Sequence, residues 1–316
     1  MDSMLNHSLL LTAARHLEWI AEEIPPLQTD EMLIQITSGA ISIGSELPIY
    51  CGTARSTAPA YYPRMTGYES VGIVIDRGSQ VQRLQIGDRV VAFYGHREHG
   101  IVSETKAIKV PNGVSDAVAL LAILTCDVTK GIRKVDPKQH EAALITGAGT
   151  MGLLTVFMLK AMEVQVVDVV EPRSERRELA VCFGAREAVT QQGMAAKGAR
   201  YAVGFECSSR NAAFELLQRN MQREGRICIL ADGNVEPLVI TPAFHEKELM
   251  MVGSSDGWDY QEHAKWYFQF VQEHPHNLEK LFDYVTTRNE LAATFDQLAS
   301  GTIQPVKVLV SYNGTG

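Results

Sequence analysis

The sequence predicts an α/β protein that joins a doubly wound parallel sheet to a second, β-rich domain. From residue 115 onward, short apolar runs alternate with helical segments, which is typical of parallel strands connected by helices. The first third of the chain instead carries short strands separated by turn residues, which is typical of a small barrel or a partly open sheet. A length of 316 residues accommodates both domains.

The β-rich part begins with two alternating segments, residues 8–20 and 31–37, which we expect to form strands. Pro25 and Pro26 interrupt the chain between them, so a hairpin or β-meander is expected there. Residues 39–66 are rich in Gly, Ser, Thr and Pro, and we expect loops that build a substrate pocket. Further strands are expected at 67–74, after the turn at Gly87 and Asp88, and at 99–110.

The second part begins with a helix predicted over residues 115–135, with Ser115 as its N-cap. The end of the chain mixes helix and strand and is expected to return to the first domain. The predicted domain boundaries are therefore 1–116, 117–256 and 257–316. The predicted strands are 142–146, 164–170, 201–206, 226–230, 248–252 and 306–311, and the predicted helices are 151–162, 174–183, 210–222, 260–272 and 276–285.

A glycine-rich turn follows the predicted strand 142–146. Gly147, Gly149 and Gly152 fit G-x-G-x-x-G, in which the glycines permit a tight turn, close approach of a pyrophosphate and close helix packing. The helix that follows offers free N–H groups to phosphates. Glu171 ends the next strand, where a carboxylate can bind ribose hydroxyls. The pattern predicts a Rossmann dinucleotide-binding unit; the alternative is an ordinary glycine turn without a ligand.

The choice between NAD and NADP depends on the residues that follow this second strand. Glu171 favours NAD(H), because a carboxylate repels a 2′-phosphate. Arg173, Arg176 and Arg177 follow at once, and a guanidinium can hold that phosphate, although they can equally form a solvated helix face. We predict NAD(P) with a preference for NAD, bound by Gly147, Gly149, Thr150, Met151, Gly152, Glu171, Arg173, Arg176 and Cys207.

The composition restricts the kinds of partner and the cellular compartment that we expect for this protein. The net charge of −8 and the lack of a basic run argue against nucleic acid as a partner. The five cysteines are scattered and form no C-x-x-C pair, which favours free thiols in a reducing compartment over disulfides or a structural zinc. The longest apolar run, 117–126, is too short to span a bilayer, and no secretory-type N-terminus is present. We expect a cytoplasmic protein, without integral membrane association, that acts on a small molecule.

Several stretches along the chain match one known family in order and spacing: ISIGSE (41–46), GYESVGIV (67–74), IGDRV (86–90), GAGTMG (147–152), EPRSERRELAVCFGA (171–185), FECSS (205–209), EGRICILA (224–231) and KELMMVGS (247–254). On these stretches the chain resembles the medium-chain dehydrogenase/reductase superfamily, the zinc alcohol dehydrogenases, over nearly its whole length. Within the superfamily it is most similar to the bacteriochlorophyllide a dehydrogenase group, on I-S-x-G-S-E, on G-Y-E-S-V-G and on the short chain. The resemblance implies a GroES-like catalytic domain beside the Rossmann domain, and a homodimer formed through an edge strand at 249–253.

The chain departs from its zinc-dependent relatives at the metal ligands. The three positions that carry ligands in those relatives read Ile43, Tyr68 and Leu121 here. Ile and Leu cannot bind Zn²⁺, which takes thiolate, imidazole or carboxylate ligands. Residues 90–110 contain no cysteine, so the structural zinc lobe is missing as well. We therefore predict a zinc-independent member with no metal site.

Other groups must then polarise the substrate oxygen and move its proton. By resemblance, Ser45 stands where relatives relay the alcohol proton, and Tyr68 replaces a ligand in the same pocket. We predict both as catalytic, although Tyr68 can also simply fill the space left by the metal. Glu69 is a candidate for electrostatic support or for a structural role, and Glu46 falls beside the pocket.

The segment AFYGHREHG contributes Tyr94, His96 and His99 on a predicted loop. His96 is a candidate proton shuttle or substrate ligand. A metal pair with His99, or contact with the central Mg of a tetrapyrrole, is an alternative. The default for histidines in a glycine-containing loop is an exposed position without a function.

The first hypothesis is a zinc-independent NAD(P)-dependent oxidoreductase for an alcohol/ketone pair, including hydroxyethyl-chlorin-like or other secondary-metabolite alcohols. The alternatives are an NAD(P)H-dependent enoyl or quinone reductase, and an NAD(P)H-binding redox sensor without turnover.

Overall fold

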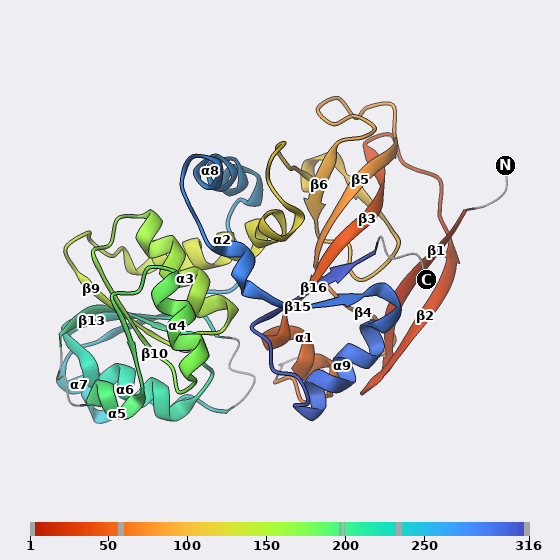
Figure 1. The fold of residues 1–316 in the computed structure, drawn as a ribbon. Coiled ribbons are helices and arrows are strands. Elements are labelled where there is room, and N and C mark those ends of the chain that lie inside the picture. The colour runs from red at the N-terminus through yellow and green to blue at the C-terminus, as the bar shows by residue number, and fades with distance from the viewer. Residues whose placement is uncertain (1–3, 56–59, 196–197, 199, 232–235, 313–316) are drawn as a thin grey trace. The chain divides into compact units, whose positions relative to one another are not determined.

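The computed structural model describes residues 4–55, 60–195, 198, 200–231 and 236–312 (Figure 1). The chain divides into two compact units. The first comprises Met1–Ala122, Tyr260–Pro275 and Leu281–Gly316, and the second comprises Ile123–Asp259 and His276–Lys280. The sequence predicts divisions after residues 116 and 256.

The second unit is built on six parallel strands in the order β11-β10-β9-β12-β13-β14. The order runs outward in both directions from β9 and β12, so β9 lies at the point where the winding reverses, as in doubly wound nucleotide-binding sheets. This confirms the predicted fold class. The strands are β9 (Ala142–Thr146), β10 (Val166–Val170), β11 (Glu187–Val189), β12 (Tyr201–Glu206), β13 (Met221–Ile229) and β14 (Met250–Gly253).

Helices connect these strands because each apolar strand must be covered on its faces. On α6, Phe214 and Leu217 are buried against Leu144 of β9 and Tyr201 of β12. The helix α3 is buried along Gly152–Leu159, on nearly every side of its axis. The helices are α3 (Thr150–Ala161), α4 (Ser174–Cys182), α5 (Gln191–Ala195), α6 (Asn211–Asn220) and α7 (Pro242–Glu246) (Figure 1).

The first unit contains a seven-stranded sheet centred on β3 (Glu31–Ile41). The long strand β3 pairs with β5 along its length, with β7 at its first half and with β16 at its second half. Met32, Ile34 and Ile36 alternate along β3 and pack in one buried core cluster, as the period of a strand requires. The other strands are β5 (Glu69–Arg77), β6 (Arg89–Ala92), β7 (His99–Ser103), β8 (Ile108–Lys109), β15 (Phe282–Thr287) and β16 (Lys307–Ser311).

The remaining elements are mostly helices. The helix α2 (Asp116–Val135) begins in the first unit and continues into the second, which starts at Ile123. It confirms the predicted helix, and the Ser115 hydroxyl accepts a hydrogen bond from the Val118 backbone N–H at 3.3 Å, as an N-cap does. The other elements are α1 (Ile43–Tyr50), the short helix η1 (Glu104–Lys106), α8 (Tyr260–Glu273), the short helices η2 (Leu278–Leu281, largely in the second unit) and η3 (Arg288–Glu290), and α9 (Leu291–Ser300).

Two strand predictions near the N-terminus were wrong. Residues 8–20 do not form one strand: β1 (Leu5–Ala13) and β2 (His16–Glu23) form a hairpin, and β4 (Arg64–Met65) pairs with β1. Arg15 makes the turn with a φ of 60°, a conformation that usually marks glycine or asparagine, so the sequence carries no turn signal there. The expected pairing of 8–20 with 31–37 is also wrong, because β3 joins the larger sheet.

Two further predictions, the helix 276–285 and the single strand 99–110, were also wrong. Residues 276–285 are not a helix, because η2 is a single turn and β15 then pairs in parallel with β16. The β-branched residues Val285, Thr286 and Thr287 favour this strand. The predicted strand 99–110 is interrupted by η1, which separates β7 from β8.

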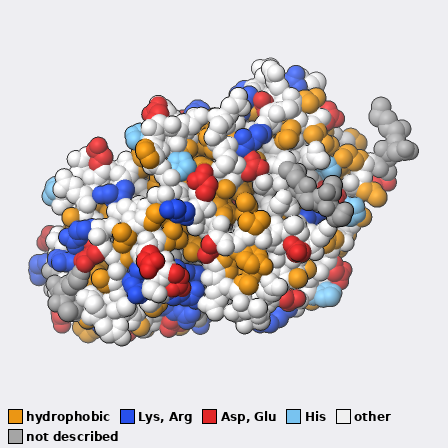
Figure 2. All heavy atoms as spheres, viewed as in Figure 1, with side chains coloured by type: hydrophobic (Ala, Val, Ile, Leu, Met, Phe, Trp, Pro, Cys, Tyr) orange, Lys and Arg blue, Asp and Glu red, His pale blue; other side chains and the backbone are white. Residues whose placement is uncertain are grey.

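The surface carries charges of both signs. Figure 2 shows acidic and basic side chains interspersed over the visible face. Among the described residues, no helix combines the length and apolarity that crossing a bilayer requires.

The C-terminus of α6 generates a stability prediction. The Lys247 ammonium donates hydrogen bonds to the carbonyl oxygens of Arg219 at 2.5 Å and Met221 at 2.7 Å, where helix carbonyls lack partners. We expect Lys247→Met to lower the free energy of unfolding by about 2 kcal/mol, since charged hydrogen bonds contribute that much. Urea denaturation measures it. The control Lys138→Met removes an exposed pair with Asp136 and should change little; equal losses in both variants would contradict the capping role.

Candidate functional site

The glycine turn after β9 has the geometry that close approach of a ligand requires. Gly147 adopts a φ of 89°, and its N–H donates to the Val170 carbonyl at 2.8 Å, which closes the turn. A Cβ at this position would lie 3.1 Å from Ser208, so both conformation and space favour glycine. A Cβ at Gly152 would lie 1.9 Å from the Gly147 carbonyl oxygen. The absence of a side chain at Gly152 therefore lets the helix pack directly on the turn.

Gly149 differs from the other two glycines because it faces open space. Among the described residues outside its own chain neighbours, none places a heavy atom within 4 Å of a Cβ built there. Gly149 is also the N-cap of α3, and no side chain caps this helix or places an acid in its first turn. The first turn of α3 therefore carries no acid that would repel a phosphate, and the helix dipole favours negative charge at this end.

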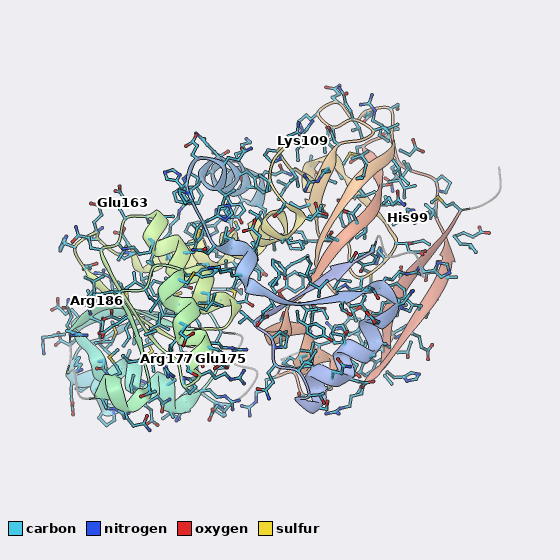
Figure 3. The ribbon with its side chains drawn as sticks, in the orientation of Figure 1. His99, Lys109, Glu163, Glu175, Arg177 and Arg186 are labelled. Atoms are coloured by element: carbon cyan, nitrogen blue, oxygen red, sulfur yellow. The ribbon has the colours of Figure 1, made fainter. Side chains whose placement is uncertain are left out.

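Glu171 lies against this turn at the end of β10. Its carboxylate is 5% exposed and accepts hydrogen bonds from the N–H groups of Ala148 at 2.8 Å and Arg173 at 3.1 Å. Arg177 donates to the backbone carbonyls of Glu171 and Pro172, so this arginine braces the chain (Figure 3). The described geometry thus places negative charge beside the glycine turn.

A second buried carboxylate, which the sequence interpretation missed, shapes the other wall of the turn. Glu206 ends β12 with no exposed surface and accepts hydrogen bonds from the N–H and the hydroxyl of Ser208 and from the N–H of Ser209. Burial raises the pKa of Glu206. The available signal was an acid at the end of an apolar strand, followed by Cys207 and two serines. The loop that Glu206 holds is the one that contacts Gly147.

Cys207 lies in the same loop. Its Cβ is 3.6 Å from a Cβ built at Gly152, and its Sγ is 3.9 Å from the Thr155 hydroxyl. Burial raises the pKa of the Cys207 thiol, so the side chain stays neutral. Its predicted part in cofactor binding, like that of Thr150 and Met151, stays a prediction.

In the first unit, the structure brings the two predicted hydroxyl groups together. Ser45 lies in the first turn of α1, and Tyr68 directly precedes β5. Their hydroxyl oxygens are 3.2 Å apart. Burial and the neighbouring Glu69 carboxylate raise the pKa of Tyr68 well above its usual value. The phenol is therefore neutral at physiological pH and can donate a hydrogen bond.

Glu46 fixes the two segments that carry these hydroxyls. One carboxylate oxygen accepts from the Ser42 N–H at 2.7 Å, at the start of α1. The other accepts from the Gly67 N–H at 3.0 Å, one residue before Tyr68. The same oxygen lies 3.2 Å from Nε2 of His96. With 7% of its surface exposed, Glu46 is placed to position residues and not to meet a substrate.

His96 is buried, so the default of an exposed loop histidine was wrong. It is 2% exposed, with Nε2 toward Glu46 and Nδ1 3.3 Å from the Tyr312 hydroxyl. His99 is also buried at the start of β7 (Figure 3), and burial lowers its pKa, so that ring is neutral. Tyr94 is buried in the core cluster of β3. The loop thus contributes to packing and positioning.

Glu69 forms an ion pair in the interior. Its Oε1 accepts hydrogen bonds from Lys307 Nζ at 2.7 Å and from the Ser42 hydroxyl at 2.5 Å, and neither charged side chain is exposed. Burial raises the pKa of Glu69, and Lys307 opposes that rise. The sequence interpretation missed Lys307 and Ser42. A lysine within the apolar run VKVLV was the available signal.

The donor chemistry at the three ligand positions does not fit a catalytic zinc. Ile43 begins α1, Leu121 is fully buried in α2, and Tyr68 binds Ser45. Zinc sites use thiolate, imidazole and carboxylate ligands, which two of these positions cannot supply. In the part of the chain that the structure describes, no three His, Cys, Asp or Glu residues are grouped to hold a metal ion.

Sequence comparison finds a family match that covers most of the N-terminal part of the first unit and the start of the second. Residues 28–151 match the alcohol dehydrogenase GroES-like domain. An L-threonine 3-dehydrogenase from Vibrio cholerae is 27% identical over 251 residues, which cover 67% of this chain and 73% of that protein.

Solved structures share the fold over nearly the whole chain. A Sinorhizobium meliloti protein bound to NADP matches with a TM-score of 0.84 and 19% identity, covering 98% of this chain and 100% of that one. An alcohol dehydrogenase from Escherichia coli complexed with NADH matches with a TM-score of 0.80 and 22% identity, with the same coverage. These matches confirm the combination of a GroES-like domain and a Rossmann sheet.

The domain match and the aligned relative support an NAD(P)-dependent dehydrogenase of the medium-chain dehydrogenase/reductase type, and the shared fold agrees with this class.

Substitutions at Gly149 and at Gly152 are predicted to have opposite effects on stability and on nucleotide binding. Gly149→Ala should melt like the unsubstituted protein, since a methyl group meets nothing there, yet weaken nucleotide binding at least tenfold by filling the phosphate space. Gly152→Ala should lower the melting temperature, because its methyl group collides with the Gly147 carbonyl. Thermal denaturation and fluorescence titration with NADH measure the two effects. Unchanged NADH affinity in Gly149→Ala would refute the phosphate site.

Proposed function

We propose that the protein is a zinc-independent, NAD(P)-dependent dehydrogenase that interconverts a secondary alcohol and its ketone. The observation that carries the proposal is the 3.2 Å contact between the hydroxyls of Ser45 and Tyr68. The family resemblance implies a metal ligand of the zinc-dependent relatives at the position of Tyr68. The Vibrio cholerae relative is named for oxidation at a secondary alcohol, which supports this substrate class. Hydroxyethyl-chlorin alcohols belong to the same class and remain candidates.

The proposed chemistry assigns the substrate oxygen to the two hydroxyls. Nicotinamide supplies or accepts the hydride when the nucleotide is bound. In ketone reduction, the neutral Tyr68 phenol donates its proton to the carbonyl oxygen, and the Ser45 hydroxyl orients the phenol through its hydrogen bond. A hydrogen-bond donor aimed at this oxygen provides the electrostatic stabilisation that a metal would otherwise supply.

We propose NAD as the preferred nucleotide. The Glu171 carboxylate lies at the end of β10, where the ribose is bound in such sheets, and its negative charge disfavours a 2′-phosphate. Arg177 does not offset that charge toward a ligand, since it donates to two backbone carbonyls. Proteins of similar fold bind either nucleotide, since the Escherichia coli structure contains NADH and the Sinorhizobium meliloti structure contains NADP.

Nucleotide preference is tested by fluorescence titration with NADH and NADPH. We expect NADH to bind at least tenfold more tightly. Glu171→Gln keeps an acceptor for the Ala148 N–H but removes the negative charge. It should therefore improve NADPH binding and reduce the difference between the affinities for NADH and NADPH. Tighter binding of NADPH to the unsubstituted protein would contradict the preference, and no binding of either nucleotide would contradict the proposed function itself.

The role of Tyr68 is tested by turnover on a panel of secondary alcohols and ketones that includes L-threonine, polyols and hydroxyethyl chlorins. Tyr68→Phe should lower kcat by about 100-fold, the usual contribution of general acid catalysis, with little change in nucleotide affinity. Ser45→Ala should lower kcat by less, since the phenol remains. Full activity of Tyr68→Phe would exclude the phenol, and turnover confined to enones or quinones would favour the reductase alternative.

A further inference from the structure

Glu46 joins two segments at which the family resemblance implies metal ligands in the zinc-dependent relatives. Its Oε1 accepts a hydrogen bond from the Ser42 N–H at 2.7 Å, in the residue before Ile43. Its Oε2 accepts one from the Gly67 N–H at 3.0 Å, in the residue before Tyr68. The carboxylate thus links the same two segments that a metal bound at positions 43 and 68 would link.

The same two segments set the distance between the candidate hydroxyl groups. The Ser42 carbonyl accepts hydrogen bonds from the Ser45 N–H at 3.2 Å and from the Ser45 hydroxyl at 3.3 Å. The Ser45 hydroxyl oxygen in turn lies 3.2 Å from the Tyr68 hydroxyl oxygen. Because Glu46 holds the N–H groups of Ser42 and Gly67, the separation of the two hydroxyl groups depends on the position of this carboxylate.

His96 and Tyr312 orient the Glu46 carboxylate. Nε2 of His96 lies 3.2 Å from Glu46 Oε2, and since both carboxylate oxygens act as acceptors, Nε2 carries the hydrogen. Nδ1 of the same ring lies 3.3 Å from the hydroxyl of Tyr312, which is 216 positions away in the chain. The His96 side chain has no exposed surface and that of Glu46 is 8% exposed, so bulk water does not replace these contacts.

Two glycines leave room for this pair of rings. Gly67 has a φ of 75°, and a Cβ there would lie 2.8 Å from a carbon of the His96 ring. A Cβ at Gly39 on β3 would lie 3.4 Å from the Tyr312 ring. The His96 backbone N–H also donates to the Thr66 carbonyl at 2.7 Å, in the residue before Gly67. His96 therefore holds this turn with both its ring and its backbone.

We infer that Glu46, oriented by His96 and Tyr312, takes the place of a metal ion in fixing the two catalytic hydroxyl groups. This inference rests on the proposed dehydrogenase function and deepens it. The aliphatic side chains at the other two ligand positions supply no donor atom for zinc, whereas the carboxylate reaches the two segments through hydrogen bonds. The three residues act by positioning, because the hydroxyl groups of Ser45 and Tyr68 are what meets the substrate oxygen.

Fluorine NMR of protein labelled with fluorotyrosine tests this positioning without turnover. Tyr68→Phe assigns the Tyr68 signal, and Ser45→Ala gives the shift that follows loss of its hydroxyl partner. We expect Glu46→Gln to shift the Tyr68 signal as Ser45→Ala does, because an amide group cannot accept hydrogen bonds from backbone N–H groups at both of its ends. An unchanged Tyr68 signal in Glu46→Gln would overturn the inference.

Two substitutions of His96 separate its contact with Glu46 from simple packing. A glutamine amide reaches the position of Nε2, whereas the shorter asparagine amide reaches only that of Nδ1. We expect His96→Gln to keep the Tyr68 signal and most of kcat. His96→Asn should shift the signal and lower kcat about 100-fold with unchanged NADH affinity, since a reacting group misplaced by about 1 Å costs that much. Equal effects of the two substitutions would contradict the role of Nε2.

Tyr312→Phe and Tyr94→Phe form a matched pair. Tyr94 is 3% exposed, and its hydroxyl has no hydrogen-bond partner in the part of the chain that the structure describes. Tyr312→Phe should change the nitrogen NMR signals of the His96 ring and shift the Tyr68 fluorine signal, because Nδ1 loses its partner. Tyr94→Phe should leave both unchanged. Identical spectra for the two variants would overturn the orientation of His96 by Tyr312.

Spectra and turnover together distinguish failure of the positioning from failure of the proposed function. Shifted Tyr68 signals in Glu46→Gln and His96→Asn, in a protein that oxidises no alcohol, would reject the dehydrogenase function and leave the positioning established. Unshifted signals in both variants, together with loss of turnover in Tyr68→Phe, would overturn the positioning and leave the dehydrogenase function. A lower melting temperature with an unshifted Tyr68 signal would show that Glu46 and His96 serve packing only.

Discussion

The buried ion pair between Glu69 and Lys307 is the interaction on which the first unit depends. It joins β5 to β16 inside the protein, and through the Ser42 hydroxyl it also fixes the start of α1. Two fully buried charges are stable only as a pair, and removing one partner of such a pair costs about 3–5 kcal/mol. The three segments must therefore meet in one arrangement, and that arrangement is what sets Ser45 beside Tyr68.

The second unit uses carboxylates in a comparable way around its glycine turn. Glu171 directly follows β10 and accepts hydrogen bonds from the N–H groups of Ala148 in the glycine turn and of Arg173. Glu206 ends β12 and accepts hydrogen bonds from N–H groups of the loop that follows it. The loops on either side of Gly147 are thereby fixed before any ligand arrives, which reduces the ordering cost of binding. In both units, buried carboxylates fix the backbone next to the candidate site. That site is the glycine turn in the second unit, and Ser45 with Tyr68 in the first.

The sequence predicted the features that depend on local pattern. The glycine turn, the alternating strands and helices and the pairing of Ser45 with Tyr68 follow from spacing or from the family resemblance. It did not predict contacts between distant segments, because nothing near Glu69 marks its partner 238 positions away at Lys307. His96 illustrates the same limit, since a loop histidine reads as exposed until Glu46 and Tyr312 are seen to enclose it. The turn at Arg15 was missed because it lacks glycine.

The most direct test of the account is turnover by protein of measured metal content. Protein treated with a strong chelator and shown by elemental analysis to lack zinc should reduce its best ketone at the untreated rate, and added Zn²⁺ should not raise that rate. This result would support proton transfer from hydroxyl groups at a site without a metal. Activity that falls in proportion to zinc and returns when zinc is restored would contradict the central claim.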